Sequence, residues 1–203
     1  MEEFLSAMQH RFACKRFADT PIPPDLLEAI LACGRLSPSS FGLEGWHFQV
    51  MASSEVRQKL FEACFSQEPV GTAPISIVIT VRTSHAYHPE GAFVRQRGER
   101  FPGSLEDYIA DYRGYYDFLN ESGRTDCWSR SQGYIAAANM MTGAASVGIQ
   151  SCAIEGFDET QVLALLGLDR QNWQVALVIA FGYPAEPERP KIREPLHELV
   201  SYF

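Results

Sequence analysis

The stretch Trp173–Tyr183, which reads WQVALVIAFGY, is the most continuously apolar part of the chain. Such a run without alternation is typical of a strand that is covered on both faces, so we expect it at the centre of a sheet. Ile75–Val81, which reads ISIVITV, has the same β-branched character. His47–Ala52 and Gln150–Ile154 are weaker strand patterns, and the sequence therefore predicts four strands.

Helical patterns separate these strands. Capping signals occur at Ser53 or Ser54, at Ser104–Asp107 and at Asp158 with Gln161. The polar stretch 82–103 has little periodicity, and we expect a lid or a mobile excursion there. Four strands separated by helices fit either an α/β or an α+β fold. We expect helices at residues 2–10, from 22–25 to about 36, from 53 or 54 to about 65, from 104 onward, from about 128 to 147, and from 158 to 167.

Two segments are suited to close contact with other helices or with a second subunit. The helix expected at 128–147 carries small residues that permit close backbone approach, either within the fold or across a dimer. The tail beyond Pro184 is rich in proline and charge but has apolar anchors, so it could wrap a neighbouring subunit.

Composition and charge restrict the class of function. The 203 residues favour one domain over 1–203, with a variable excursion at about 84–125. With 17 Lys+Arg against 25 Asp+Glu, the formal net charge of -8 argues against nonspecific binding of nucleic acid or anionic membranes. The longest apolar run, Val175–Phe181, is too short to span a bilayer. Because the start Met1-Glu2-Glu3 is acidic and no apolar region follows, we expect no signal peptide and a cytoplasmic location.

Cysteine and histidine usage indicates no metal centre. The 5 cysteines are widely spaced and form no C-x-x-C pair, so a disulfide framework or a structural zinc site is not expected. Cys14 stands among basic residues, yet no base lies near it in sequence, and we interpret it as a structural thiol. His85 and His88 have no cluster of further ligands beside them and are interpreted as loop residues.

Basic motifs at both ends of this acidic chain indicate an anion site. Residues 11–17 read RFACKRF and residues 190–193 read PKIR. Between them lie PSS at 38–40 and IEGF at 154–157. No G-x-G-x-x-G or phosphate-loop motif is present, so a bound phosphate would be held by side chains. A phosphorylated cofactor is the guest that this pattern favours.

Six segments in this order resemble the nitroreductase family of flavoenzymes. The resemblance covers nearly the whole chain except residues 84–125. The segments are Arg11…Lys15…Phe17, Pro38-Ser39-Ser40…Trp46-His47-Phe48, Ser66-Gln67, Trp128…Gln132-Gly133-Tyr134, Ile154-Glu155-Gly156-Phe157 and Lys191-Ile192-Arg193.

The resemblance implies an α+β fold with a central, mostly antiparallel sheet flanked by helices. It also implies a long interface helix, a C-terminal tail that extends onto the partner subunit, and a homodimer with FMN at its interface. In this interpretation Arg11, Lys191 and Arg193 hold the 5′-phosphate of FMN. The backbone of Phe12 and Ala13 would follow the same anion.

The same resemblance assigns residues to the flavin ring. Lys15 would lie near the N1/O2 edge, where negative charge appears on reduction. The backbone at Ile154, Glu155 and Gly156 would face N5 and O4, and the bare backbone of Gly156 would allow close approach. The remaining contacts are assigned to Pro38, Ser39 and Ser40 of the other subunit on the ribityl side, and to Ser66 or Gln67 on the pyrimidine edge.

These assignments lead to a functional hypothesis. We expect an FMN-dependent oxidoreductase that takes hydride from NADH or NADPH and reduces nitroaromatics, quinones or related small aromatic oxidised substrates by a ping-pong mechanism. No catalytic side chain is expected, since the flavin carries the chemistry.

Several alternatives stay open. A specialised branch could carry out reductive dehalogenation, flavin cleavage or enone reduction, and a flavin-binding dimer could act as a sensor or carrier. Binding of no cofactor at all ranks last. Glu44-Gly45 replaces the usual Gln-Pro, and Phe41-Gly42-Leu43 replaces polar residues, so the substrate preference is open. Phe41 with Tyr115, Tyr116 and Phe118 could make an aromatic pocket.

Overall fold

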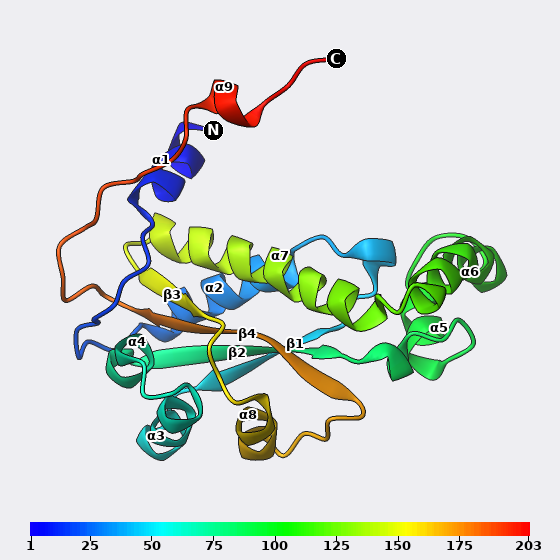
Figure 1. The fold of residues 1–203 in the computed structure, drawn as a ribbon, viewed down its shortest axis with the longest axis horizontal. Coiled ribbons are helices and arrows are strands. Elements are labelled where there is room, and N and C mark those ends of the chain that lie inside the picture. Colours follow the sequence, from blue (N-terminus) through cyan, green and yellow to red (C-terminus); the bar gives the residue numbers. More distant parts are fainter.

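A four-stranded antiparallel sheet lies at the centre of the computed structural model, which describes residues 1–203 (Figure 1). All three neighbouring strand pairs are antiparallel. The two most apolar segments form the central strands, and the expected α+β architecture is confirmed. The strands are β1 (Trp46–Met51), β2 (Ile75–Arg82), β3 (Gln150–Ile154) and β4 (Trp173–Gly182), in the spatial order β1-β2-β4-β3.

One face of the sheet is covered by α2 (Pro24–Arg35) and α7 (Thr125–Ser146) (Figure 1). Ile77 and Ile79 of β2 pack there against Met140 of α7 in one buried cluster. The small residues of α7 serve this packing inside the chain. Burying this apolar surface supplies most of the driving force for this layer.

The opposite face is covered by α3 (Ser54–Ala63), α4 (Glu68–Thr72) and α8 (Glu159–Leu166) (Figure 1). Leu60 and Val178 belong to the buried cluster on this side. The expected caps form: the Ser53 hydroxyl accepts from the Val56 N–H at 3.4 Å, and Asp158 accepts from Thr160 and Gln161 at the start of α8. The short helix α4 was not indicated by periodicity, because five residues are too few to show it.

The segment that we expected to be a lid or a mobile excursion forms packed helices. It contains η2 (Ser84–Ala86), α5 (Ala92–Gly98) and α6 (Leu105–Glu121), the last capped by Ser104 as expected. Tyr87 and Tyr112 are fully buried there, and the Tyr112 hydroxyl donates to the Tyr87 carbonyl at 2.8 Å. Because tyrosine carries a hydroxyl, the segment reads as polar in the sequence, and its buried core was not predicted.

Both chain ends lie on the same side of the sheet as α7 (Figure 1). α1 (Glu2–His10) leads into the N-terminal turn, and the segment after β4 runs back alongside it to α9 (Leu196–Leu199). Apolar side chains on these two ends are exposed: Phe4, Leu5, Met8, Ile192, Leu196, Leu199, Tyr202 and Phe203.

Gly133 on α7 lies against the sheet so closely that an added side chain would meet it. A Cβ there would lie 2.8 Å from Ala176 Cβ and 3.1 Å from Val81 Cγ1. We expect Gly133→Ala to lower the free energy of unfolding by about 1–2 kcal/mol, since overpacking outweighs the gain in helix propensity. Urea denaturation at fixed protein concentration measures this.

Gly114→Ala is the matched control, because a Cβ at this position of α6 meets nothing within 4 Å. It should raise stability by up to about 1 kcal/mol. A stability gain from both substitutions would contradict close packing of α7 on the sheet.

Candidate functional site

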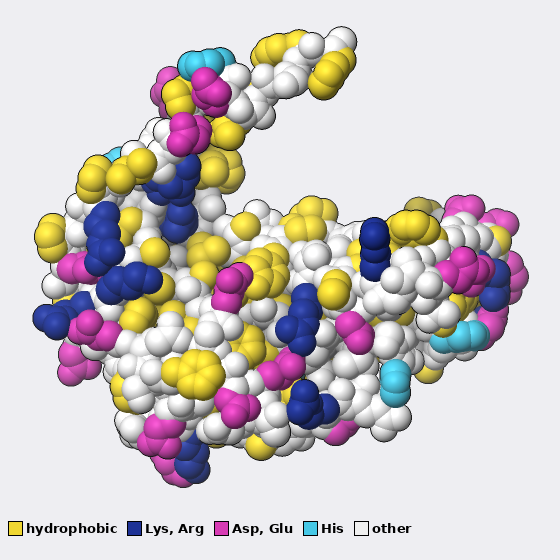
Figure 2. Space-filling view, in the orientation of Figure 1, with side chains coloured by type: hydrophobic (Ala, Val, Ile, Leu, Met, Phe, Trp, Pro, Cys, Tyr) yellow, Lys and Arg dark blue, Asp and Glu magenta, His cyan; other side chains and the backbone are white.

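Three predicted cations meet where the C-terminal segment crosses the N-terminal turn. Arg11, Lys191 and Arg193 line one hollow of about 250 Å³ together with the backbone of Phe12 and Ala13. Lys191 Nζ donates to the Arg11 carbonyl oxygen. Figure 2 shows Lys and Arg side chains gathered over this part of the molecule. Residues about 180 positions apart in sequence thus form one basic pocket.

The charges in this hollow are not neutralised within the chain. None of the three cations forms an ion pair, whereas the neighbouring Arg189 is paired with Glu186 at 2.8 Å. Partial burial, together with the charges of Arg11 and Arg193, lowers the pKa of Lys191 from its ordinary value, and Glu188 offsets this only in part. A cluster of unpaired cations is stabilised by an anion, and a phosphate group has the required charge and acceptor oxygens.

Gln150 at the start of β3 holds the N-terminal turn in place. Its side chain accepts from the Phe12 N–H at 3.1 Å and donates to the His10 carbonyl at 3.1 Å. The Phe12 N–H is therefore already bonded, and of the two backbone positions expected at the anion only Ala13 retains an N–H that donates to no group in the chain. Gln150 was missed from the sequence, where a glutamine at a strand start carries no signal.

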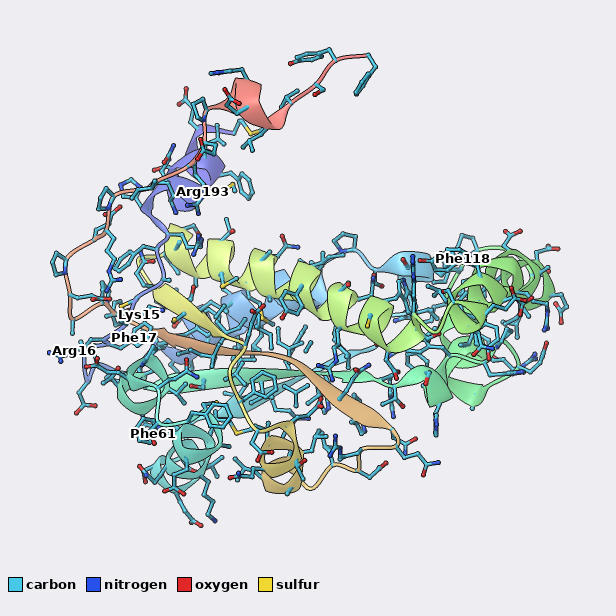
Figure 3. All side chains as sticks on the ribbon, in the orientation of Figure 1. Lys15, Arg16, Phe17, Phe61, Phe118 and Arg193 are labelled. Atoms are coloured by element: carbon cyan, nitrogen blue, oxygen red, sulfur yellow. The ribbon has the colours of Figure 1, made fainter.

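Lys15 lies beside β3 on the same side as Arg193 (Figure 3). Its Nζ donates to Cys152 Sγ at 3.3 Å, and its backbone N–H donates to the Glu186 carboxylate. No carboxylate pairs with the ammonium group, so the charge of Lys15 is not neutralised within the chain. Burial raises the pKa of the adjacent Cys14 to about 11, which keeps that thiol protonated at neutral pH.

The end of β3 meets the turn that precedes α4. Gln67 Nε2 donates to the Gly156 carbonyl at 2.6 Å. Phe65 and Ser66 have φ of 55° and 54°, an uncommon conformation for residues other than glycine that redirects the chain toward Gly156. Ile154 is buried, while the N–H groups of Glu155 and Gly156 donate to no group within the chain. The predicted ring contacts from 66–67 and 154–156 are therefore adjacent, with free donors.

Tyr134 was named only as part of a motif, yet it contacts this region directly. Its hydroxyl donates to Glu155 Oε1 at 2.8 Å. Partial burial and this hydrogen bond raise the pKa of Tyr134 to about 12, so its phenol stays neutral and continues to donate. The Glu155 carboxylate is thereby held by α7, which leaves the backbone of the 154–156 turn to face outward.

Ser40, the last of the predicted residues Pro38, Ser39 and Ser40, does not lie beside the basic N-terminal turn within one chain. Ser40 is held by the N-terminal half of α7, where its N–H donates to Gln132 Oε1 at 3.0 Å. The N-terminal turn lies near the opposite end of α7, at Ser146. At a rise of about 1.5 Å per residue, these two positions on α7 are about 21 Å apart.

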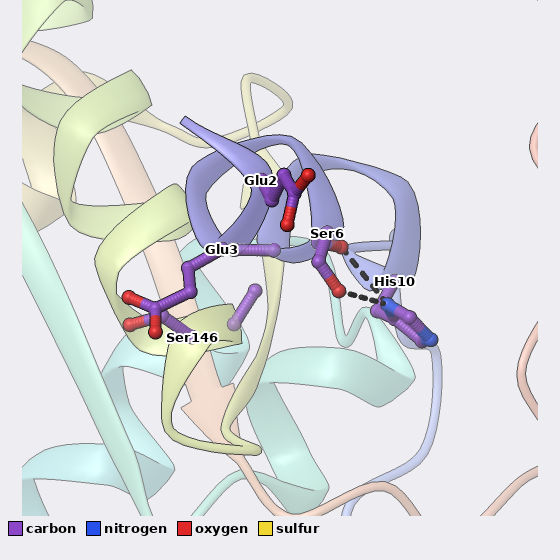
Figure 4. Close-up of a pocket in the computed structure, with 7 residues that line it drawn as sticks. Glu2, Glu3, Ser6, His10 and Ser146 are labelled. Carbon is purple, nitrogen blue, oxygen red and sulfur yellow. Dashed lines mark hydrogen bonds between the residues drawn. The ribbon is translucent and has the colours of Figure 1, made fainter.

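A larger hollow than the basic pocket lies away from the predicted site. It has about 700 Å³ and lies between α1 and the end of α7, lined by residues that include Glu2, Glu3 and His10 (Figure 4). Its acidic lining does not suit a phosphate. No group of three or more His, Cys, Asp or Glu side chains could hold a metal ion. No helix is long and apolar enough to cross a membrane.

Comparison with known proteins identifies the family. The model of the nitroreductase family matches residues 8–183. The chain belongs to the nitroreductase family. A candidate NAD(P)H nitroreductase of Staphylococcus epidermidis is 34% identical to it, over 99% of this chain and 97% of that protein. A candidate NAD(P)H nitroreductase of Bacillus subtilis is 31% identical, over 98% of this chain and 97% of that protein.

Solved structures show the same fold. A nitroreductase-like protein of Streptococcus mutans matches this nitroreductase-family chain with a TM-score of 0.86 at 20% identity, over 100% of this chain and 98% of that one. A candidate nitroreductase of Exiguobacterium sibiricum was solved in complex with FMN. It matches with a TM-score of 0.83 at 18% identity, over 98% of this chain and 97% of that one. The family membership predicted from the six sequence segments is confirmed.

The basic pocket leads to a prediction about anion binding. We expect inorganic phosphate to raise the melting temperature of the cofactor-free protein, because an anion relieves the repulsion among the three cations. At a phosphate concentration of about 100 times the Kd, the free energy of unfolding would rise by about 2.7 kcal/mol. Lys191→Ala and Arg193→Ala should each lose most of it. Differential scanning fluorimetry in phosphate against chloride at equal ionic strength measures this.

Lys59→Ala serves as the control, since it removes a lysine that is paired with Glu55 at 2.7 Å on the surface of α3. It should retain the full response to phosphate. An equal response in all the variants would show that the pocket does not bind the anion.

Proposed function

We propose that this protein is an FMN-dependent oxidoreductase that uses NADH or NADPH to reduce nitroaromatics, quinones or related acceptors, and that it works as a homodimer. The observation that carries the proposal is the convergence of three elements on one side of the molecule. They are the unpaired cations around Lys191, the unpaired ammonium of Lys15, and the free N–H groups at Glu155 and Gly156.

The residues present fit FMN chemically. Arg11, Lys191 and Arg193 would hold its phosphate, and the turn at Glu155 and Gly156 would offer N–H donors to the polar edge of a flat ring. A Cβ at Gly156 would approach Gln67 Nε2 to 3.3 Å and reduce the room over this turn. The curated relatives are described as candidate NAD(P)H nitroreductases, which supports a reduced nicotinamide as the electron donor.

The bound flavin would accept hydride from the nicotinamide and pass two electrons to the acceptor. The task of Lys15 is electrostatic: a cation without a neutralising carboxylate stabilises negative charge that develops nearby. The N–H groups of Glu155 and Gly156 would donate to the ring and orient it, which requires no proton transfer by a side chain. Because one pocket would serve donor and acceptor in turn, we expect ping-pong kinetics.

A homodimer accounts for two features of the isolated chain. Ser40 lies about 21 Å along α7 from the basic N-terminal turn, and a second copy could supply Pro38–Ser40 to that turn. The apolar side chains of α1 and of the C-terminal segment, Phe4 and Leu199 among them, are exposed and would be covered by a partner. The chain ends project from the body in Figure 1, as a segment that reaches a neighbour would.

The proposal is tested by recording the visible spectrum of the FMN-loaded protein without oxygen, before and after NADPH or NADH. We expect a yellow protein that bleaches with at least one of the two. Lys15→Ala should still bind oxidised FMN but be reduced about 10- to 100-fold more slowly, since a hydrogen bond to a charged group contributes about 1.5–3 kcal/mol.

Lys59→Ala is again the control for loss of one lysine. Bound flavin that neither nucleotide reduces would replace this proposal with a non-redox flavin-binding protein. A chain that stays colourless with FMN would refute the proposal altogether.

The dimeric site is tested by mixing two defective variants, Lys15→Ala and Ser40→Trp, after reversible dissociation. If each site takes Lys15 from one subunit and Ser40 from the other, half of the random dimers contain one intact site. Activity should then recover to about a quarter of wild type. No recovery in dimers of confirmed mixed composition would show that both residues act within one chain.

A further inference from the structure

The loop that follows Ser40 has a strained backbone. Phe41 has φ 53° and ψ 18°, Glu44 has φ 47°, and Gly42 between them has φ 59°. Residues other than glycine adopt this left-handed conformation at a cost in free energy, and they keep it where surrounding groups hold it. Such strain concentrates at functional sites, so the groups that hold this loop are of interest.

Side chains from the connection between α5 and α6 and from the first turn of α6 hold the loop in place. Arg100 makes two contacts: Nη2 donates to the Gly42 carbonyl at 3.0 Å, and Nη1 pairs with Glu44 Oε2 at 3.1 Å. The Tyr108 hydroxyl donates to the Phe41 carbonyl at 2.9 Å. A Cβ at Gly42 would lie 2.2 Å from the ring of Phe101, so that ring covers the backbone directly.

The clamped backbone directs the Phe41 ring into a row of aromatic side chains. Its centroid lies 5.2 Å from Tyr112, which packs edge-on from below. It lies 5.5 Å from Tyr115 at an interplanar angle of 32°, and Tyr115 lies 6.4 Å from Phe118 at 28°. The first pair is tilted and the second is stacked, and both centroid distances lie in the range over which aromatic rings attract each other. The row runs from half-buried Phe41 to Phe118 on α6, which is 56% exposed (Figure 3).

We propose that Arg100 is a positioning residue that fixes Phe41 within this aromatic row, and that the row selects flat aromatic acceptors. The inference rests on the proposed function, because Pro38–Ser40 directly before Phe41 are the residues proposed to reach the partner's flavin. Exposed aromatic faces offer stacking to a quinone or nitroarene and nothing comparable to a compact inorganic oxidant.

Arg100 differs from Arg95 of α5 and Arg113 of α6 in what it contacts. Arg95 and Arg113 both pair with Glu90, at the exposed surface of α5 and α6. Arg113 and Arg100 have similar exposure, 47% and 41%, but Arg113 touches no part of the strained loop. Arg113→Ala therefore removes one positive charge of similar exposure, as Arg100→Ala does, but leaves the contacts of Arg100 with the loop intact.

The first measurement is hydrogen–deuterium exchange over residues 39–45 of the FMN-loaded protein. We expect Arg100→Ala to exchange there several-fold faster than wild type and Arg113→Ala to exchange at the wild-type rate. Arg100→Lys should be intermediate, because one ammonium cannot reproduce the fork that reaches Gly42 and Glu44 together.

The second measurement is the ratio of kcat/KM for 1,4-naphthoquinone to that for ferricyanide, with the same reduced nicotinamide. This ratio should fall about tenfold in Arg100→Ala, through KM for the quinone, and stay at the wild-type value in Arg113→Ala. Phe41→Gly should lower the ratio similarly without faster exchange, since glycine keeps the left-handed backbone but lacks the ring.

Equal exchange and equal ratios in Arg100→Ala and Arg113→Ala would overturn the inference. Faster exchange in Arg100→Ala with an unchanged ratio would also overturn it, since the loop would then be clamped without selecting the acceptor. Failure of the proposed function has a different signature: wild-type protein would reduce neither quinone nor ferricyanide with NADPH or NADH.

Discussion

The two central strands have almost no polar face, and this constraint determines the arrangement of the other elements. Every residue of β4 after Trp173 is buried, as are the first seven of β2. Apolar strands of this kind must be covered on both sides, so α2 and α7 occupy one face while α3, α4 and α8 occupy the other. Beyond the two sheet edges, polar backbone groups remain free where strands end, and the turn after β3 is one of these places.

The candidate cofactor site depends on that geometry and on charge. β3 is an edge strand, and the N-terminal turn is held against its start by Gln150. The returning C-terminal segment adds Lys191 and Arg193 to Arg11 without a compensating carboxylate. Repulsion among these three cations lowers the stability of the folded chain when no anion is bound. An anion relieves that repulsion, so the same arrangement favours phosphate binding.

The end of the molecule formed by α5 and α6 is held together by buried aromatic side chains. The segment 84–121 buries aromatic rings whose hydroxyls are satisfied locally, as when Tyr87 bonds to Ser129 at 2.7 Å. This small core is rigid enough to hold the 41–44 loop in its left-handed conformation. Ser40, directly before this loop, lies about 21 Å along α7 from the basic N-terminal turn, and the proposed homodimer would bring the aromatic row of one chain to the basic pocket of the other.

The sequence by itself determined the strands, most helices and their caps, because those depend on local periodicity and on side chains a few positions apart. It also indicated Lys191 and Arg193 as partners of Arg11, since unpaired basic motifs in an acidic chain stand out. Tertiary structure alone decided the roles of Gln150, Tyr134 and Arg100. Their partners lie between 21 and 140 positions away, and no local pattern encodes such contacts. The helix from 104 onward was predicted, but α5 and the packing of 84–121 into a buried core were not, for a related reason: tyrosine is apolar in its ring and polar in its hydroxyl, and only the fold shows which part is buried.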